Sequence, residues 1–170
     1  MRRFPMSLDA AHRRITTVVI GLCAAVLGIQ VAVCRPPVAW IPLLTAALLA
    51  PIMGSCWAVA PTALSIDGRM LRIERRGWRP LDIPLDDIAR TDGVPSLRPF
   101  GAVRLFGVGG FFGTFGLMWS RSIGRFRAYV TRSAPSLLRR RRSALPVLVT
   151  PDDRDAVVAA LRAAGVPDVP

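Results

Sequence analysis

Few side chains of this chain could perform acid, base or nucleophilic chemistry. His12 is the only histidine, and in sequence it is remote from the aspartate pairs at 86–87 and 152–153. Adjacent aspartates of this kind are typical of turns and helix starts. We expect His12 to lie far from the carboxylates of the soluble part. No Ser-His-Asp set, cysteine nucleophile or metal-ligand cluster can be assembled, so we expect no catalysis, metal or cofactor.

The three cysteines, Cys23, Cys34 and Cys56, lie within or at the end of two apolar runs. Their spacing fits no metal motif, and a disulfide framework would need pairs outside a membrane. We interpret them as small apolar residues of membrane helices.

A glycine- and aromatic-rich run, residues 106–116, could suggest a nucleotide site. A dinucleotide fingerprint starting at Gly107 would need glycine at position 112, where Phe112 stands, and a P-loop needs lysine, which is absent. Bent strands of a small barrel are the favoured interpretation. The alternative is an aromatic loop that touches a membrane interface through four rings: Phe111, Phe112, Phe115 and Trp119.

Four adjacent arginines, Arg139, Arg140, Arg141 and Arg142, form the sharpest charge feature. In a strand half of them would point inward, so we predict a hairpin tip between strands at 136–139 and 145–150. Such a tip could be a solvated turn that aids solubility, or it could contact anionic lipid at about 1 kcal/mol per arginine. Binding of nucleic acid is the weakest interpretation, since apart from its charge the chain shows no recognisable helix or strand that would read a nucleic acid.

Two uncharged apolar runs, residues 15–34 and 38–60, each have the length of a membrane span, because about 20 helical residues cover about 30 Å. The link at 35–37 is so short that the helices must be antiparallel. Nine arginines flank the outer ends of the runs, whereas only Arg35 lies in the link. The positive-inside rule therefore predicts a multi-pass inner-membrane protein with both termini in the cytoplasm.

Small residues recur every four positions along the second run and so share one helix face. This face could be a packing seam within the hairpin or between copies, or it could simply reflect the abundance of alanine. The residues are Ala46, Ala50, Gly54 and Ala58.

After the second run the apolar pattern takes a period of two, as in short strands at 63–67, 70–75 and 81–85. At the other end, Thr150 as a cap and Pro151 at the first position predict a C-terminal helix that Gly165 stops. We expect six or seven antiparallel strands closed by this helix. The predicted parts are an N-terminal segment at 1–14, a transmembrane hairpin at 15–60, a soluble domain at 61–165 and a tail at 166–170.

The segments 106–118, 124–131 and 149–153 resemble a bacterial branch of the pleckstrin-homology-like domains that follows two membrane helices. The resemblance covers residues 62–164 and the hairpin. It implies an α+β membrane protein whose PH-like antiparallel β-barrel or sandwich is closed by one C-terminal helix. It also implies a binding or assembly module, often oligomeric, and does not imply catalysis. Inositol-lipid binding does not carry over, because no matching motif surrounds the basic residues near the first strands: Arg69, Arg72, Arg75 and Arg76.

These features favour a non-catalytic scaffold module at the cytoplasmic face of the inner membrane, which could contact anionic lipid, a protein partner or a second copy. The alternative is an accessory subunit of a transporter or envelope enzyme, assembled through its membrane helices. Tethering of nucleic acid is a third and less favoured function.

Overall fold

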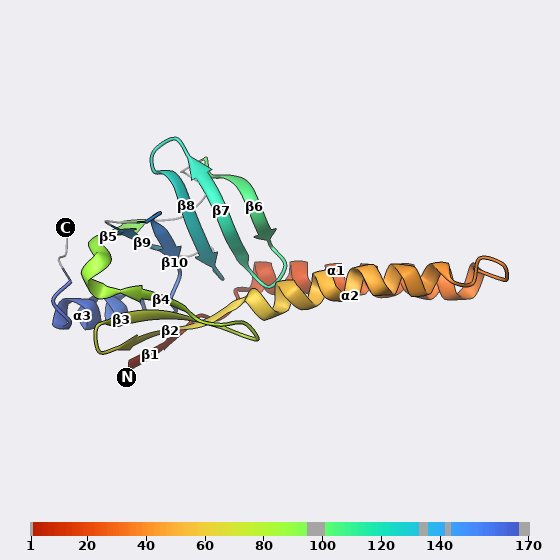
Figure 1. The fold of residues 1–170 in the computed structure, drawn as a ribbon, viewed down its shortest axis with the longest axis horizontal. Helices are drawn as coiled ribbons and strands as arrows, with labels where there is room; N and C mark the ends of the chain where they lie inside the picture. Colours follow the sequence, from red (N-terminus) through yellow and green to blue (C-terminus); the bar gives the residue numbers. More distant parts are fainter. Residues whose placement is uncertain (1, 95–100, 133–135, 142–143, 167–170) are drawn as a thin grey trace.

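The structure is a computed structural model, and it describes residues 2–94, 101–132, 136–141 and 144–166. Two antiparallel helices, α1 (Ala10–Val33) and α2 (Ile41–Val59), project as a hairpin from a domain of two sheets and a third helix (Figure 1). Both helices are long and apolar enough to cross a membrane. The link between them spans residues 34–40, which is longer than predicted, because α1 ends at Val33 and α2 begins only at Ile41.

Helix α1 begins earlier than the apolar run suggests, and its start is set by a cap. The Asp9 side chain accepts a hydrogen bond from the backbone N–H of His12 at 2.8 Å, which satisfies one of the free donors of the first turn. Its first turn therefore belongs to the domain side of the molecule rather than to the apolar span.

The first sheet confirms the three predicted strands and adds a fourth from the N-terminal segment. The strands are β1 (Arg2–Pro5), β2 (Pro61–Asp67), β3 (Met70–Arg75) and β4 (Leu81–Pro84), antiparallel in that order. The sequence predicted segment 1–14 as an N-terminal segment ahead of the hairpin, and in the structure its strand β1 pairs with β2 of the first sheet. The whole apolar hairpin of α1 and α2 is the connection between these two neighbouring strands.

The second sheet has the order β5-β9-β10-β8-β7-β6 and follows a 3-10 turn at Leu85–Asp87. All its pairs are antiparallel except β10 with β8, which is parallel. Its strands are β5 (Ile88–Val94), β6 (Val103–Gly109), β7 (Thr114–Ser120), β8 (Gly124–Val130), β9 (Ser136–Arg141) and β10 (Val147–Val149).

The expectation of six or seven antiparallel strands in a closed barrel is wrong. In the part of the chain that the structure describes, nine strands follow α2, one pair is parallel, and the two sheets stay separate. Pro84 ends β4, and the 3-10 turn then redirects the chain, so β5 joins β9 instead of extending the first sheet.

Helix α3 (Arg154–Ala163) packs its apolar face against the main core with Val157 and Leu161. Its N-cap is Asp153, whose carboxylate accepts from Ala156 N at 2.9 Å, so the helix begins later than the Thr150 cap predicted. The main core contains residues from both sheets, including Leu64, Leu71, Ile73, Ile83, Phe115, Tyr129, Val147 and Val149. A second cluster contains Met118, Phe126, Ala128, Val130 and Leu148.

Candidate functional site

The region where the hairpin joins the domain concentrates the specific contacts of the molecule, and we call it the hairpin base. The chain enters it after β1, where Met6 N donates to Thr62 O at 3.0 Å on the first sheet. Three residues later, Asp9 N donates to Thr131 O at 3.1 Å, just beyond β8 of the second sheet. The short stretch before α1 therefore ties both sheets to this helix.

His12 lies buried in this base, where it contacts a carboxylate of its own segment and a hydroxyl of the domain rather than the aspartate pairs of the domain. Its ring Nδ1 is 2.7 Å from Asp9 Oδ1, and its Nε2 is 3.3 Å from Thr114 Oγ1 at the start of β7. The order carboxylate, imidazole, hydroxyl resembles that of hydrolases. Here the carboxylate also caps α1 and both ring nitrogens have partners, so the set fastens the helix to the sheet.

The glycine-rich turn between β6 and β7 contacts the next turn of α1. Phe112 N donates to Thr16 Oγ1 at 2.9 Å, and a Cβ placed on Gly110 would meet the Ile15 side chain at 3.1 Å. Phe112 has a φ of +56°, which a bulky residue adopts only where its surroundings hold it. The turn is thus shaped to receive the helix.

The end of α2 is fastened in a similar way from the turn after β3. Gly77 N donates to Ala58 O at 2.9 Å, and the Arg76 guanidinium lies 5.6 Å from the Trp57 ring. The same guanidinium lies 5.7 Å from the Phe112 ring, which belongs to the turn that holds α1. One cation thus joins both halves of the base through cation–π contacts.

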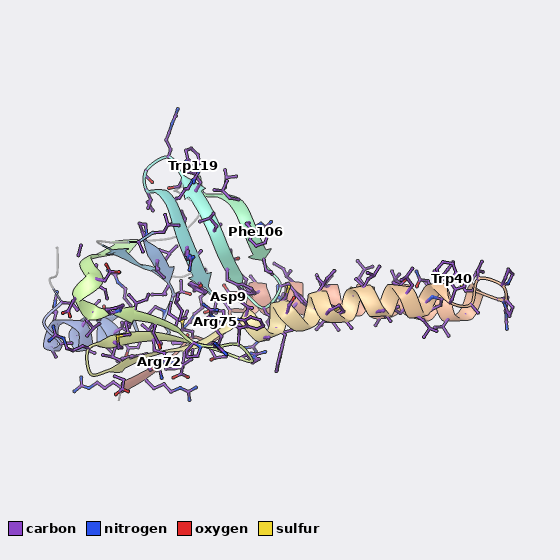
Figure 2. All side chains as sticks on the ribbon, in the orientation of Figure 1. Asp9, Trp40, Arg72, Arg75, Phe106 and Trp119 are labelled. Carbon is purple, nitrogen blue, oxygen red and sulfur yellow. The ribbon has the colours of Figure 1, made fainter. Side chains whose placement is uncertain are left out.

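The arginines near the first strands are engaged within the domain, as Figure 2 shows for Arg72 and Arg75. Arg75 donates to Tyr129 Oη at 3.3 Å and lies 5.5 Å from that ring. Arg72 pairs with Asp82 at 2.6 Å, and the hydrogen bond and charge of this carboxylate raise the pKa of the guanidinium. Arg69 pairs likewise with Asp86 at 2.7 Å. Because these cations already have partners, the strands do not present them as a free basic pocket.

A shallow hollow of about 430 Å³ lies on the outer side of the base, along the first turns of α1. It is lined by Ala10, Arg13, Arg14, Thr17 and Val18.

The aromatic rings predicted to touch a membrane through the loop are mostly inside. Phe111 and Phe115 are buried, Phe112 is half-buried, and only Trp119 is exposed. The alternative of a loop whose rings touch a membrane interface does not hold for these three rings, because Phe112 and Phe115 pack against the main core and Phe111 contacts Phe112. Sequence reasoning missed Phe106, which stands exposed on β6 (Figure 2). Its position at the end of the sheet, rather than any local pattern, leaves it uncovered.

The predicted arginine run does not form a hairpin tip. Arg139, Arg140 and Arg141 lie in β9, which pairs with β10 on one side and β5 on the other, whereas Arg142 lies outside the described residues. The strand continues because both neighbours supply hydrogen-bonding partners. What these arginines contact stays a prediction, since the structure does not describe their side chains.

The small-residue face of α2 points mostly outward. Ala50 and Gly54 are exposed, and a Cβ placed on Gly54 would meet nothing within 4 Å. Ala46 is half-buried, and Ala58 is half-buried against Gly77 at the base. Ala50 and Gly54 are thus not covered within the described chain, and the role of this face as a packing seam stays a prediction.

Comparison with known proteins agrees with this architecture. A search of curated proteins and a search of solved structures found no match. The family model described as the bacterial PH domain matches residues 62–164, which run from β2 to the end of α3. The match covers more than half of the chain, and the chain therefore belongs to the bacterial PH domain family.

Proposed function

We propose that this protein is a membrane-anchored, non-catalytic interaction module whose hairpin holds the PH domain against the cytoplasmic face of the inner membrane. The observation that carries this proposal is the hairpin base. Hydrogen bonds from both helices, at Thr16 and Ala58, fix the domain in one orientation relative to the apolar hairpin. A flexible tether would need none of these contacts.

The distribution of aromatic and basic residues supports insertion in this orientation. Trp40 is exposed at the far end of the hairpin (Figure 2), and Trp57 is exposed near its base. Tryptophan favours the two membrane interfaces, so the pair would mark both surfaces of the bilayer. Arg13 and Arg14, beside the hollow at the base, would bind anionic headgroups at about 1 kcal/mol each.

The arginine run at 139–142 is a second candidate contact for anions. Its strand β9 lies on the side of the domain away from the hairpin (Figure 1). That placement favours an acidic face of a protein partner, or of a second copy, over the bilayer that holds the hairpin. As a scaffold, the domain would then face the membrane on the side of the hairpin and bind this partner on the opposite side.

Maleimide labelling in cells with a permeabilised outer membrane tests the topology. The native Cys34 at the far end of the hairpin should react with a membrane-impermeant maleimide, whereas a cysteine introduced by Ala163→Cys on α3 should react only after lysis. Cys23 and Cys56 are replaced by alanine in both variants, and Cys34 is also replaced by alanine in the Ala163→Cys variant. Labelling of position 163 in intact cells would reject the proposal.

Lipid preference is tested on the full chain in detergent by counting bound phosphatidylglycerol with native mass spectrometry. The double variant Arg13→Ala, Arg14→Ala should retain less of this lipid than the wild type. The control, Arg125→Ala with Arg127→Ala, removes the same charge from exposed positions on β8. Equal losses in both would show that net charge alone governs retention.

A second candidate function is that of an accessory subunit assembled through α2. The outward exposure of Ala50 and Gly54 favours it, because small residues let a neighbouring helix approach closely in lipid. Ala50→Leu and Gly54→Leu should then abolish recovery of a crosslinked complex, whereas Leu48→Phe on the opposite side of the helix should not. Unchanged complexes in all three variants would leave the PH domain as the interacting part.

A further inference from the structure

Strand β6 is unusually apolar for a strand so exposed to solvent. Val103 is 55% exposed, Leu105 51% and Phe106 80%, and these residues with Arg104 form what we call the β6 rim. β6 is also the edge strand of its sheet in the described part of the chain. Exposed apolar residues gathered on one edge mark a contact surface more often than single exposed hydrophobic residues do.

The hairpin fixes where this rim lies relative to a membrane. In Figure 1 the strands run in the order β8, β7, β6 toward the side on which the helices extend. The turn that follows β6 contacts Ile15 and Thr16, at the start of the apolar part of α1. The end of β6 therefore reaches the level where the hydrocarbon core would begin.

Local geometry argues against pairing of the free edge of β6 with a further strand. The register with β7 shifts between Arg104 and Phe106, which leaves Leu105 as an extra residue in a bulge. Gly107, directly after the rim, has a φ of +129°, outside the conformation of a regular strand. Bulges and twisted ends are features that protect sheet edges from strand addition.

Distance along the strand places Phe106 within reach of the headgroup layer. Phe106 lies three positions before Gly109, which is about 10 Å along the strand. The strand slopes away from the hairpin in this direction. The polar layer on each side of a bilayer is about 5–8 Å thick, and a phenylalanine side chain covers part of the remaining distance. We infer that the β6 rim rests on the lipid headgroups of the leaflet from which the hairpin enters, with Phe106 as its deepest side chain.

The chemistry of the rim fits this zone. Aromatic and aliphatic side chains gain from the boundary between headgroups and acyl chains. The Arg104 side chain runs along the strand so that its guanidinium lies over Gly109, on the membrane side of the rim, where it can bind a lipid phosphate. Water and phosphates can also satisfy the backbone groups of an edge strand, which the hydrocarbon core cannot.

This inference rests on the proposed membrane insertion, so the test measures both separately. The full chain, with its three cysteines replaced by alanine, receives one environment-sensitive fluorophore through Phe106→Cys, Ala163→Cys or Val26→Cys. Each labelled protein is placed in nanodiscs that contain lipids carrying a nitroxide at the headgroup or deep in the acyl chain. Position 26 reports on α1 within the bilayer, and position 163 lies on α3 away from the hairpin.

The label at 106 should lose several times more fluorescence to the headgroup nitroxide than the label at 163. Quenching at 26 by the deep nitroxide, together with equal and weak quenching at 106 and 163, would overturn the inference while leaving the hairpin inserted. Weak quenching at all three positions would overturn membrane insertion itself. Shielding at 106 that grows with the number of protein copies per disc, without lipid quenching, would assign the rim to a second copy and also overturn the inference.

Discussion

The two halves of the β6–β7 ribbon belong to one pair of strands but meet different surroundings. In the inner half, Phe115 faces Val108 across the ribbon and is only 5% exposed within the main core. In the outer half, Phe106 faces Leu117 and is 80% exposed. The same strands thus supply core packing at one end and an exposed apolar surface at the other.

A glycine pair marks the boundary between the halves. Gly107 and Gly116 lie opposite each other in the register, and both have positive φ values. A Cβ on Gly116 would collide with the Phe106 carbonyl oxygen and lie 2.7 Å from the Gly107 Cα. The two backbones approach so closely that the ribbon can bend here, which separates the direction of its outer half from that of its inner half.

Substitution at this boundary should have the largest effect, because it damages both halves at once. Gly116→Ala combines a backbone collision with a φ of +136° that side chains rarely adopt. We expect the PH domain to lose cooperative unfolding, measured by circular dichroism during heating in mild detergent.

Gly109→Ala is the matched control, since its Cβ would meet only the mobile end of the Arg104 side chain. Its free energy of unfolding should stay within about 0.5 kcal/mol of the wild type. If the two variants unfolded alike, the close approach at Gly116 would not be what shapes the ribbon.

The same substitution, phenylalanine to alanine, tests the comparison directly when it is made once in each half of the ribbon. Phe115→Ala should lower the free energy of unfolding of the domain by about 3–5 kcal/mol, because it leaves a cavity in the main core. Phe106→Ala should change it by no more than about 0.5 kcal/mol in detergent, since its ring is mostly exposed. Denaturant unfolding of the full chain measures both, and similar losses would contradict the division into halves.

A smaller effect is expected where the inner half holds α1. Thr16→Val keeps the shape of the side chain but leaves the Phe112 N–H without its acceptor, which costs about 1–3 kcal/mol in a buried setting. Amide exchange at residues 110–113 should accelerate. Thr17→Val is the control, because Thr17 donates only to Arg13 O on the exposed side of the same helix. Equal exchange in both variants would mean that the turn is ordered without the helix.

Much of the fold follows from local patterns in the sequence. Alternation predicts β2, β3 and β4, and hydropathy predicts both helices of the hairpin. These elements can be predicted because each depends on the pattern of apolar and polar residues within its own segment. The sequence pattern of residues 2–5 carries no such period, so β1 could not be predicted, and only its partner β2 makes it a strand.

The hairpin base could not be predicted for a related reason. His12 and Thr114, or Thr16 and Phe112, are about a hundred residues apart, and nothing local to either indicates the other. For the arginine run the prediction failed for the opposite reason. Charge repulsion, a local property, predicted a turn, but contacts with neighbouring strands decided the structure. Pairing of β9 on both sides holds Arg139, Arg140 and Arg141 in a strand despite their repulsion.

The pairing of β1 with β2 imposes an order on biogenesis. In the sequence β1 precedes both helices and its partner strand follows them, so β2 is translated only after the whole hairpin. If the hairpin inserts into a membrane as proposed, β1 and β2 can pair only when both lie on the same side of it. A chain with β1 on the other side would leave β2 with an open edge, and insertion in that orientation would also yield a misfolded domain that proteases can recognise.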